Sequence, residues 1–511
     1  MYELPSGADI QTIISTIKTG AQFFLPEIFL SGLFLVLILL DLAVRPARHH
    51  VLSITSLVGL LASFYFIVQQ HAMTGEEIFF GMYVVDEFAL FFKYLLVGSA
   101  VLTVLLSMPS DELNSRTSGL GEYYPLLVGM TIGMVMMASA TDLLMIFLAM
   151  EMVSLAAYVL TGYLKRERRS TEAALKYLVY GAVSSGLMIY GFSILYGMTG
   201  ATNIAVISQV LTERGYDPLL LMVASLMILA GIGYKIGAVP FHFWSPDVYE
   251  GAPLPVTAFL SVASKAAGFA LLMRFFYVAV PQTIDPAGFV PGLDWVTILM
   301  ILSVASMIYG NIVALWQTNV KRLLAYSSIA HAGYALLGII VMDELGTQAT
   351  LFYLVSYLFM NFGAFLVAIL IANKTGSENL EDYRGLGRRM PLAGAAMTVF
   401  LISLVGLPPT VGFIGKLMIF SALLAKGSLF IWLALIGILT SVISLYYYML
   451  IPLNMYLREA RHPLPDKIPS GFLPQAVTAG LMILTLYFGI FFTPLSDFAL
   501  SAISIFGNQL F

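Results

Sequence analysis

The chain of 511 residues contains no cysteine. It therefore has no thiolate for an iron–sulfur cluster or a metal ion, and no disulfide. The sequence also lacks a glycine-rich dinucleotide motif and a phosphate-binding loop, and its six histidines are scattered without metal-ligand spacing. We expect no cofactor and no metal site in this chain, so any redox chemistry that it serves takes place in another chain.

Charge is also scarce, since charged residues make up 11% of the sequence and hydrophobic residues 59%. Soluble domains are about 25% charged and about 45–50% apolar, and no stretch here is polar enough for one. We therefore expect lipid to be the main solvent and nucleic acid not to be a partner. At about 20 apolar residues per span, the chain holds about 14 transmembrane helices. The first apolar run, Gln22 to Ala43, lacks the features of a signal peptide and is expected to be retained.

Apolar runs follow one another along the whole chain. They cover residues 23–43, 51–70, 87–108, 123–140, 142–163, 171–198, 218–249, 254–280, 293–316, 320–341, 347–372, 391–425, 428–456 and 471–493. The runs at 218–249 and 391–425 are too long for one straight span, and each contains proline, at Pro240 and at Pro408 with Pro409. Because proline removes a backbone donor and clashes with the preceding turn, we predict two discontinuous helices.

Two interrupted helices at corresponding places in two halves are typical of transport sites built from inverted repeats. The spacing predicts an all-α polytopic membrane protein in four parts. These are a three-helix segment at 1–122, five-helix repeats at 123–280 and 293–456, and a last transmembrane helix within 457–511.

Lysine and arginine in the loops predict the orientation. With the N-terminus outside, sixteen of them fall on the inner side: Arg45, Arg48, Arg116, Lys165, Arg166, Arg168, Arg169, Lys321, Arg322, Lys374, Arg384, Arg388, Arg389, Arg458, Arg461 and Lys467. The outer side holds Lys18, Arg214 and Lys426, with the acidic residues Glu76, Glu77, Asp285, Asp343 and Glu344. We therefore expect an even number of spans with both termini outside.

Ionisable residues also lie inside the apolar runs. They are Lys93, Lys176, Lys235, Lys265, Arg274 and Lys416, together with Glu151, His331 and His242. A charge at a helix centre costs about 2.5–3.5 kcal/mol, so central charges must be paired, hydrated or neutralised. Lys93, Lys176 and Arg274 lie close enough to helix ends to reach the interface, and Glu27 and Asp142 are expected to cap helices.

A buried lysine suits proton transfer, because desolvation lowers the pKa of an amine and a nearby carboxylate raises it again. We predict a polar row at one depth that runs Glu151, Lys235, Lys265, His331, Lys416, with Lys176 and His242 as secondary candidates. Within it, Glu151 and Lys235 are expected to be direct or one-water neighbours. Serines and a tyrosine beside Lys265 and His331 agree with hydration. The alternatives are structural ion pairs and, for the two histidines, satisfied positions in the core.

Five segments resemble the N subunit of the bacterial proton-pumping NADH:quinone oxidoreductase, complex I. They read YKIGAVPFHFWSPDVYEGAPLPVTAFLSVASKAAGFALLMR at 234–274, FLAMEMVSLAAYVLTGY at 147–163, EAALKYLVYGAVSSGLMIYG at 172–191, KRLLAYSSIAHAGYALLG at 321–338 and LVGLPPTVGFIGKLMIF at 404–420. The resemblance covers essentially the whole chain. It implies proton translocation through Glu151, Lys235, Lys265 and Lys416, with Lys176, His242 and His331 as further relay residues.

The resemblance also implies partners and a location. It implies an antiporter-like subunit of a translocase in the bacterial inner membrane, beside M-type and small K-, J- and A-type subunits, with FMN, iron–sulfur clusters and quinone bound elsewhere in the complex. Lys416 and the absence of a long C-terminal extension favour the N-type over the M- and L-type subunits.

Three other readings stay open. One is a cation/proton antiporter of the related Mrp type, against which the PDVYEGAP segment at 246–253 speaks. Another is a scaffold without transport, in which apolar residues could replace the intramembrane lysines. The third is a related photosynthetic complex that takes electrons from ferredoxin, which the residues do not distinguish from an NADH-dependent one.

Overall fold

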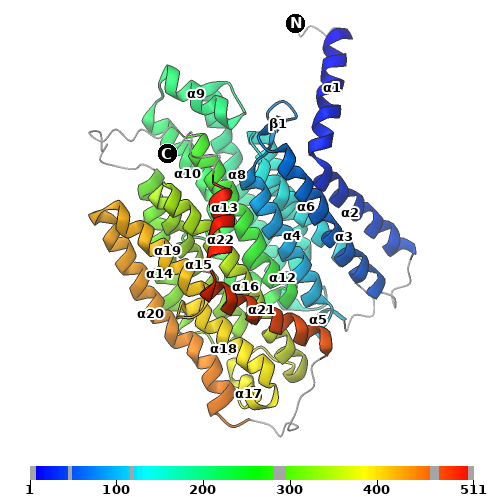
Figure 1. Cartoon of the computed structure of the whole chain (residues 1–511), viewed down its shortest axis with the longest axis vertical. Coiled ribbons are helices and arrows are strands. Elements are labelled where there is room, and N and C mark those ends of the chain that lie inside the picture. The colour runs from blue at the N-terminus through cyan, green and yellow to red at the C-terminus, as the bar shows by residue number, and fades with distance from the viewer. Residues whose placement is uncertain (1–6, 44–48, 115–119, 281–294, 461–470, 504–511) are drawn as a thin grey trace.

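The computed structural model describes residues 7–43, 49–114, 120–280, 295–460 and 471–503. Figure 1 shows a bundle of helices beside one small hairpin of strands. Among the described residues, 12 helices are long and apolar enough to cross a membrane, and Tyr123–Ser139 and Pro391–Val405 are shorter apolar helices. The predicted all-α polytopic fold is confirmed.

Among the described residues, the first half of the chain forms thirteen α-helices and one hairpin. They are α1 Gly7–Phe23, α2 Leu25–Ala43, α3 His49–Gln70, β1 Glu76–Ile78, β2 Tyr83–Val85, α4 Glu87–Ser107, α5 Asp111–Asn114, α6 Tyr123–Ser139, α7 Leu143–Thr161, α8 Arg168–Thr199, α9 Ile204–Arg214, α10 Pro218–Ile236, α11 Trp244–Gly251, α12 Leu254–Phe259 and α13 Lys265–Val278. A π-helical turn at Leu260–Ser264 joins α12 to α13 in one span.

The second half of the described chain is helical. Its α-helices are α14 Trp295–Ala314, α15 Val320–Val341, α16 Glu344–Thr375, α17 Leu386–Arg389, α18 Pro391–Val405, α19 Val411–Lys426, α20 Ser428–Leu457, α21 Phe472–Ile490 and α22 Thr493–Ser501. A short 3₁₀ turn, Leu380–Tyr383, precedes α17.

Both predicted helix breaks are present, and they have the same local structure. The helix before each break, α10 or α18, ends on a glycine in the left-handed conformation, Gly237 at φ 70° and Gly406 at φ 88°. A proline follows three residues later, Pro240 or Pro409. Glycine adopts this conformation without a steric penalty, and proline prevents the helix from continuing. This similarity supports the predicted pair of repeats, whose boundaries stay a prediction.

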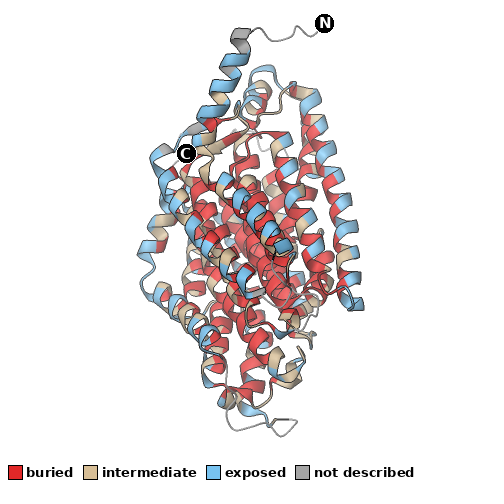
Figure 2. Cartoon of the chain, turned by 90° about the vertical axis from the view of Figure 1, so that its right-hand side faces the viewer, coloured by how far each residue is buried: buried red, intermediate tan, exposed pale blue. Residues whose placement is uncertain are grey.

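Among the described spans, the two that carry Lys265 and His331 are the most deeply covered. The apolar windows of Leu254–Val278 and Val320–Val341 are 100% buried, whereas those of α20 and α21 are 28% buried. Figure 2 shows buried residues concentrated inside the bundle and exposed residues along the helices at its edge. Lys265 and His331 therefore lie in the protein interior and not against lipid.

The apolar runs did not predict α1, the hairpin, α9 or α22. These elements are short or have polar residues among their apolar ones, so hydropathy alone gives no signal for them. The orientation of the termini stays a prediction. Six residues used for it, Arg45, Arg48, Arg116, Asp285, Arg461 and Lys467, lie outside the described residues.

Candidate functional site

Glu151 and Lys235 meet at Ser154. Lys235, fully buried in the last turn of α10, donates from Nζ to Ser154 Oγ at 2.8 Å. Ser154 follows Glu151 by three residues on α7, so the two share one helix face. Glu151 Oε1 is buried without a hydrogen-bond partner, and no direct ion pair to Lys235 is formed within the described part of the chain. The two charges are near enough to interact, and Ser154, which binds Lys235, lies about one helical turn after Glu151 on α7.

The break after α10 places the backbone of Gly237 close to the side chain of Lys265. A Cβ atom on Gly237 would lie 3.3 Å from Lys265 Nζ. A Cβ atom on Gly268, three residues after Lys265, would lie 3.4 Å from Lys235 Cβ. Glycine at these two positions therefore lets α10 and α13 approach closely and makes Lys235 and Lys265 neighbours across that contact.

Lys265 directly follows the π-helical turn, and its side chain forms hydrogen bonds with a residue of α15. Its Nζ donates to the carbonyl oxygen of Ser328 at 2.8 Å and to Ser328 Oγ at 2.9 Å. Ser328 precedes His331 by three residues on the same helix. π-Helical turns inside α-helices are frequent at functional sites. Lys265 is thus joined directly to the helix that carries His331.

A cavity of about 10 Å³ lies between Lys265 and His331. Its lining comprises Val262, Lys265, Phe269, Ser328, His331, Ala332, Ala335, Tyr353, Leu354 and Tyr357. A volume of roughly 10–15 Å³ holds one water molecule when polar partners are present. Lys265 and His331 therefore line a common space of about the size of one water molecule.

Two tyrosines hold the ring of His331. Tyr353 Oη on α16 lies 2.5 Å from Nδ1, and Tyr448 Oη on α20 lies 3.0 Å from Nε2. A third ring, Tyr334 on α15, packs edge-on with its centroid 5.7 Å from that of His331. His331 is 4% exposed, so its polar surroundings within the described residues come from protein hydroxyls.

Lys416 is held at the second break. Its Nζ donates to the carbonyl oxygens of Leu404 at 3.0 Å and Val405 at 2.8 Å, and to Ser441 Oγ at 2.8 Å. The last carbonyls of a helix carry partial negative charge, here at the end of α18. The same Nζ lies 4.4 Å from the centroid of the Tyr334 ring, a cation–π distance. Tyr334 thus contacts both His331 and Lys416.

The two secondary candidates have different surroundings. Lys176 is 39% exposed and pairs with Asp247 at 2.6 Å and Glu172 at 2.9 Å, so it lies outside the buried row. His242 follows the first break and is buried, with its ring centroid 4.5 Å from those of Phe243 and Tyr309. Neither ring nitrogen of His242 makes a hydrogen bond to the part of the chain that the structure describes. The relay role of both residues stays a prediction.

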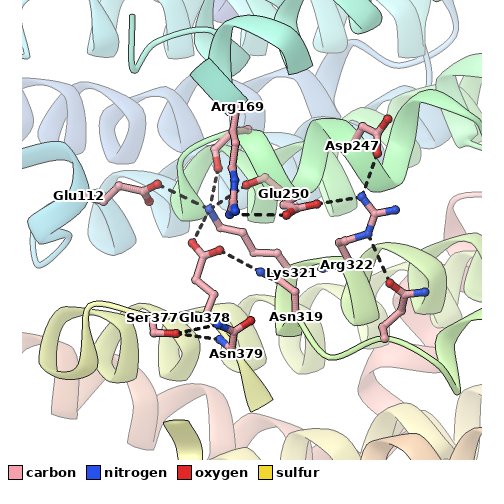
Figure 3. A network of polar contacts seen from close by, with 12 residues as sticks. Glu112, Arg169, Asp247, Glu250, Asn319, Lys321, Arg322, Ser377, Glu378 and Asn379 are labelled. Carbon is pink, nitrogen blue, oxygen red and sulfur yellow. Dashed lines mark hydrogen bonds and ion pairs between the residues drawn. The ribbon is translucent and has the colours of Figure 1, made fainter. Parts of the chain in front are cut away.

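A charged network joins α11 and α15 (Figure 3), and it includes Asp247, the partner of Lys176. Arg322 Nη1 pairs with Asp247 at 2.9 Å and with Glu250 at 2.8 Å. Lys321 Nζ pairs with Glu378 at 2.6 Å and with Glu112 at 3.5 Å. The network borders a hollow of about 1340 Å³. Lys176 and Arg322 share Asp247, so this network ties the two halves of the chain together.

The interpretation of Lys93 and Arg274 as residues that reach the interface was wrong. Lys93 and Arg274 are 0% and 3% exposed and do not reach the interface. Lys93 Nζ pairs with Glu27 Oε1 at 2.8 Å, and Arg274 binds Asp86 with two parallel contacts at 2.8 and 2.9 Å. Glu27 lies in the first turn of α2, as expected for a carboxylate at a helix start, and its ion pair is an additional role. Folding brings these partners together from α2, α4 and α13, which the sequence alone does not show. Asp142 does cap α7, accepting from Leu144 N at 2.9 Å.

Sequence reasoning missed Ser154, Tyr353 and Tyr448. It also missed Asn311, which forms hydrogen bonds with the hydroxyls of Tyr334 and Tyr447. The spacing of Ser154 from Glu151 on one helix face is a signal that could have identified it. The tyrosines gave no such signal, because the chain contains 27 of them. Among the described residues no three histidine, aspartate or glutamate side chains gather as a metal site, and the expectation of no cofactor stays untested.

A family model matches part of the chain, and curated relatives match nearly all of it. Residues 140–444 match the model described as NADH:quinone oxidoreductase/Mrp antiporter, TM. A relative from Chlorobium chlorochromatii (strain CaD3), NADH-quinone oxidoreductase subunit N, is 66% identical over 100% of both chains. A second, NADH-quinone oxidoreductase subunit N 2 from Chloroherpeton thalassium, is 59% identical over 99% of both.

Solved structures share the fold. A chain of respiratory complex I from Thermus thermophilus superposes with a TM-score of 0.76 at 32% identity, over 93% of this chain and 99% of that one. A chain of the Mrp complex from Dietzia sp. superposes with a TM-score of 0.77 at 21% identity, over 96% and 98%. The second likeness concerns the fold alone.

Proposed function

This chain belongs to the subunit N family of NADH-quinone oxidoreductases, and from that premise we propose that its own buried residues carry protons through the membrane. It is an antiporter-like, multi-pass membrane subunit of that enzyme complex. Electron transfer from NADH to quinone then takes place in other subunits, and this chain contributes a non-redox step to the translocase.

The observation that carries this proposal is the contact series across the protein interior. Lys235 and Lys265 adjoin at the contact of α10 with α13, Lys265 and His331 face one cavity, and Tyr334 touches both His331 and Lys416. Titratable groups in the membrane interior that face other helices or water are typical of proton pathways. A purely structural set of lysines would not need to be contiguous.

Glu151 would control the first step. A carboxylate close to Lys235 favours the charged ammonium, and its withdrawal or protonation favours release of the proton. The only hydrogen bond of Lys235 Nζ within the described residues goes to a neutral serine hydroxyl. The ammonium is therefore not fixed by a direct ion pair, and a change at Glu151 can alter how strongly Lys235 holds its proton.

The remaining expectations join this proposal. The partners are the M-type and the small K-, J- and A-type subunits of the membrane arm, and FMN and the iron–sulfur clusters lie in other chains. The location is the bacterial inner membrane with both termini on the outer side. An Mrp-type antiporter is the second candidate function, since the Dietzia Mrp chain has the same fold; the relatives named subunit N disfavour it.

The test compares two lysines on α19. Lys416→Met removes the ammonium at the break, whereas Lys426→Met removes one at the end of the same helix, where the side chain is 36% exposed. We expect assembled complex with Lys416→Met to lose most NADH-driven quinone reduction and proton pumping together, and Lys426→Met to keep both. Normal pumping by assembled Lys416→Met complex would reject the role of this residue.

A further inference from the structure

Both ring nitrogens of His331 are engaged by phenol hydroxyls from other helices. Nδ1 lies 2.5 Å from Tyr353 Oη and Nε2 lies 3.0 Å from Tyr448 Oη. Neither contact is to Lys265 or Lys416. A proton that enters or leaves the ring in this arrangement therefore has to pass through a tyrosine oxygen.

The chemistry of the three groups fits such a passage. A neutral imidazole has one N–H donor and one acceptor nitrogen, whereas a phenol hydroxyl both donates and accepts. One tyrosine consequently donates to His331 while the other accepts from it. The three groups therefore form a hydrogen-bonded chain in which all donors point the same way. After a proton has passed along the chain, all donors point the opposite way.

Tyr353 connects this chain to Lys265. It lines the cavity that Lys265, Ser328 and His331 also line. One water in that cavity would reach the Tyr353 hydroxyl from the Lys265 side. Tyr357, one turn further along α16, lines the same cavity, but its hydroxyl makes no hydrogen bond to the described residues.

Tyr448 connects the chain to the Lys416 side. Its hydroxyl bonds Ser327 Oγ, and its ring packs against Tyr447 with centroids 4.4 Å apart. Tyr447 Oη donates to Asn311 Oδ1 at 2.9 Å, and Asn311 Nδ2 donates to Tyr334 Oη at 3.1 Å. Lys416 lies over the Tyr334 ring, so polar groups link Tyr448 to the surroundings of Lys416.

We propose that Tyr353 and Tyr448 are proton-relay residues on opposite sides of His331, an inference that rests on the proposed function. The Lys265 ammonium gives a proton to the cavity water, and that water gives one to Tyr353 Oη as the O–H proton of Tyr353 moves to His331 Nδ1. The Nε2 proton moves to Tyr448 Oη as the proton of Tyr448 passes to its hydrogen-bond partner Ser327 Oγ. The hydroxyl proton of Ser327 passes to a water that this proposal requires on the Lys416 side, and that water delivers a proton to the neutral amine of Lys416.

This sequence of steps is balanced. Lys265 loses one proton, Lys416 gains one, and each tyrosine ends with its hydroxyl intact, so neither a tyrosinate nor a radical forms. The imidazole ends as the other neutral tautomer and returns to the first before the next proton passes. A hydroxyl at both nitrogens is thus required, and phenylalanine at either position interrupts the chain.

The test uses variants that remove one oxygen each and keep the aromatic ring. In assembled complex we expect Tyr353→Phe and Tyr448→Phe to slow proton pumping on the order of a hundredfold, the low end of what a positioned acid–base group contributes. Tyr357→Phe is the matched control and should pump close to the wild-type rate. It shares the helix and the cavity and packs its ring 5.0 Å from that of His331, but its hydroxyl makes no hydrogen bond to the described residues.

The solvent deuterium isotope effect distinguishes a proton-relay role of these tyrosines from a merely structural role. When a relay oxygen is removed, proton transfer limits turnover and the isotope effect rises above that of the wild type. A merely structural loss slows turnover and leaves the isotope effect unchanged. An assembled Tyr353→Phe complex with wild-type pumping, or a slow one with an unchanged isotope effect, overturns the inference.

The same measurements distinguish this inference from the proposed function. If Lys416→Met abolishes pumping while Tyr353→Phe and Tyr448→Phe pump normally, the tyrosine relay fails and the lysine pathway stands. If assembled Lys416→Met complex pumps normally, the role of Lys416 in the proposed function fails, and the relay that ends on Lys416 fails with it.

Discussion

Within the described residues, the side chains of Lys235, Lys265 and Lys416 bind neutral groups, and no carboxylate lies within ion-pair distance of them. Their Nζ atoms contact hydroxyls and carbonyls of Ser154, Ser328, Leu404, Val405 and Ser441, and the ring of Tyr334. Hydrogen bonds between two ionised groups hold charge more strongly than those to neutral acceptors. These lysines therefore keep the freedom to exchange a proton, which a tight ion pair would restrict.

Lys93 shows the opposite arrangement and allows a stability prediction. Its Nζ lies 2.8 Å from Glu27 Oε1, and both side chains are fully buried. Lys93→Met leaves the Glu27 carboxylate buried without its cation, which we expect to cost about 3–5 kcal/mol. Thermal melting of the purified complex, followed as loss of this subunit on native gels, should shift to lower temperature.

The double variant Glu27→Gln with Lys93→Met serves as the control. It removes both charges and preserves approximate shape, so it should recover most of the lost stability. A single Lys93→Met variant as stable as the wild type would contradict a buried ion pair at this position.

At the scale of elements, the sequence predicted the spans and both breaks because these depend on local properties. Apolar length predicts a span, and Pro240 and Pro409 predict where a helix stops. The partners of Lys93 and Arg274 depend instead on how distant helices pack, which no local pattern encodes. For the same reason Glu151, Lys235 and Lys265 could be predicted as candidates, but Tyr353 and Tyr448 could not.

The glycine at the first break gives an element-scale prediction. Gly237→Ala would place a Cβ atom 3.3 Å from Lys265 Nζ in a left-handed residue. Gly200, at φ 71°, ends α8 in the same conformation with nothing within 4 Å of its Cβ position. Each alanine costs about 1–2 kcal/mol of backbone strain, but only Gly237→Ala displaces a lysine of the row.

We therefore expect Gly237→Ala to lower proton pumping severalfold and Gly200→Ala to leave it near the wild-type rate. Pumping in membrane vesicles, normalised to assembled complex, measures both. Equal effects of the two substitutions would indicate that strain alone matters and that the close approach of Lys265 has no role.

At the scale of the whole molecule, the row crosses from one half of the chain to the other. It starts on α7 and α10, passes through α13 and α15, and ends on α19. Its first member, Glu151, is half-buried on a helix whose neighbouring residues Leu148 and Leu155 are exposed. The row thus begins near the surface of the chain and runs through its most deeply buried helices.

The central claim is that protons pass through this chain along that row. The most direct test is NADH-driven acidification by complex reconstituted in vesicles in sodium-free buffer, comparing the wild type with Lys265→Met. The account predicts that the wild type acidifies the lumen without sodium, and that fully assembled Lys265→Met complex translocates far fewer protons per second. An assembled Lys265→Met complex that moves protons at the wild-type rate and with the wild-type number per electron would contradict it.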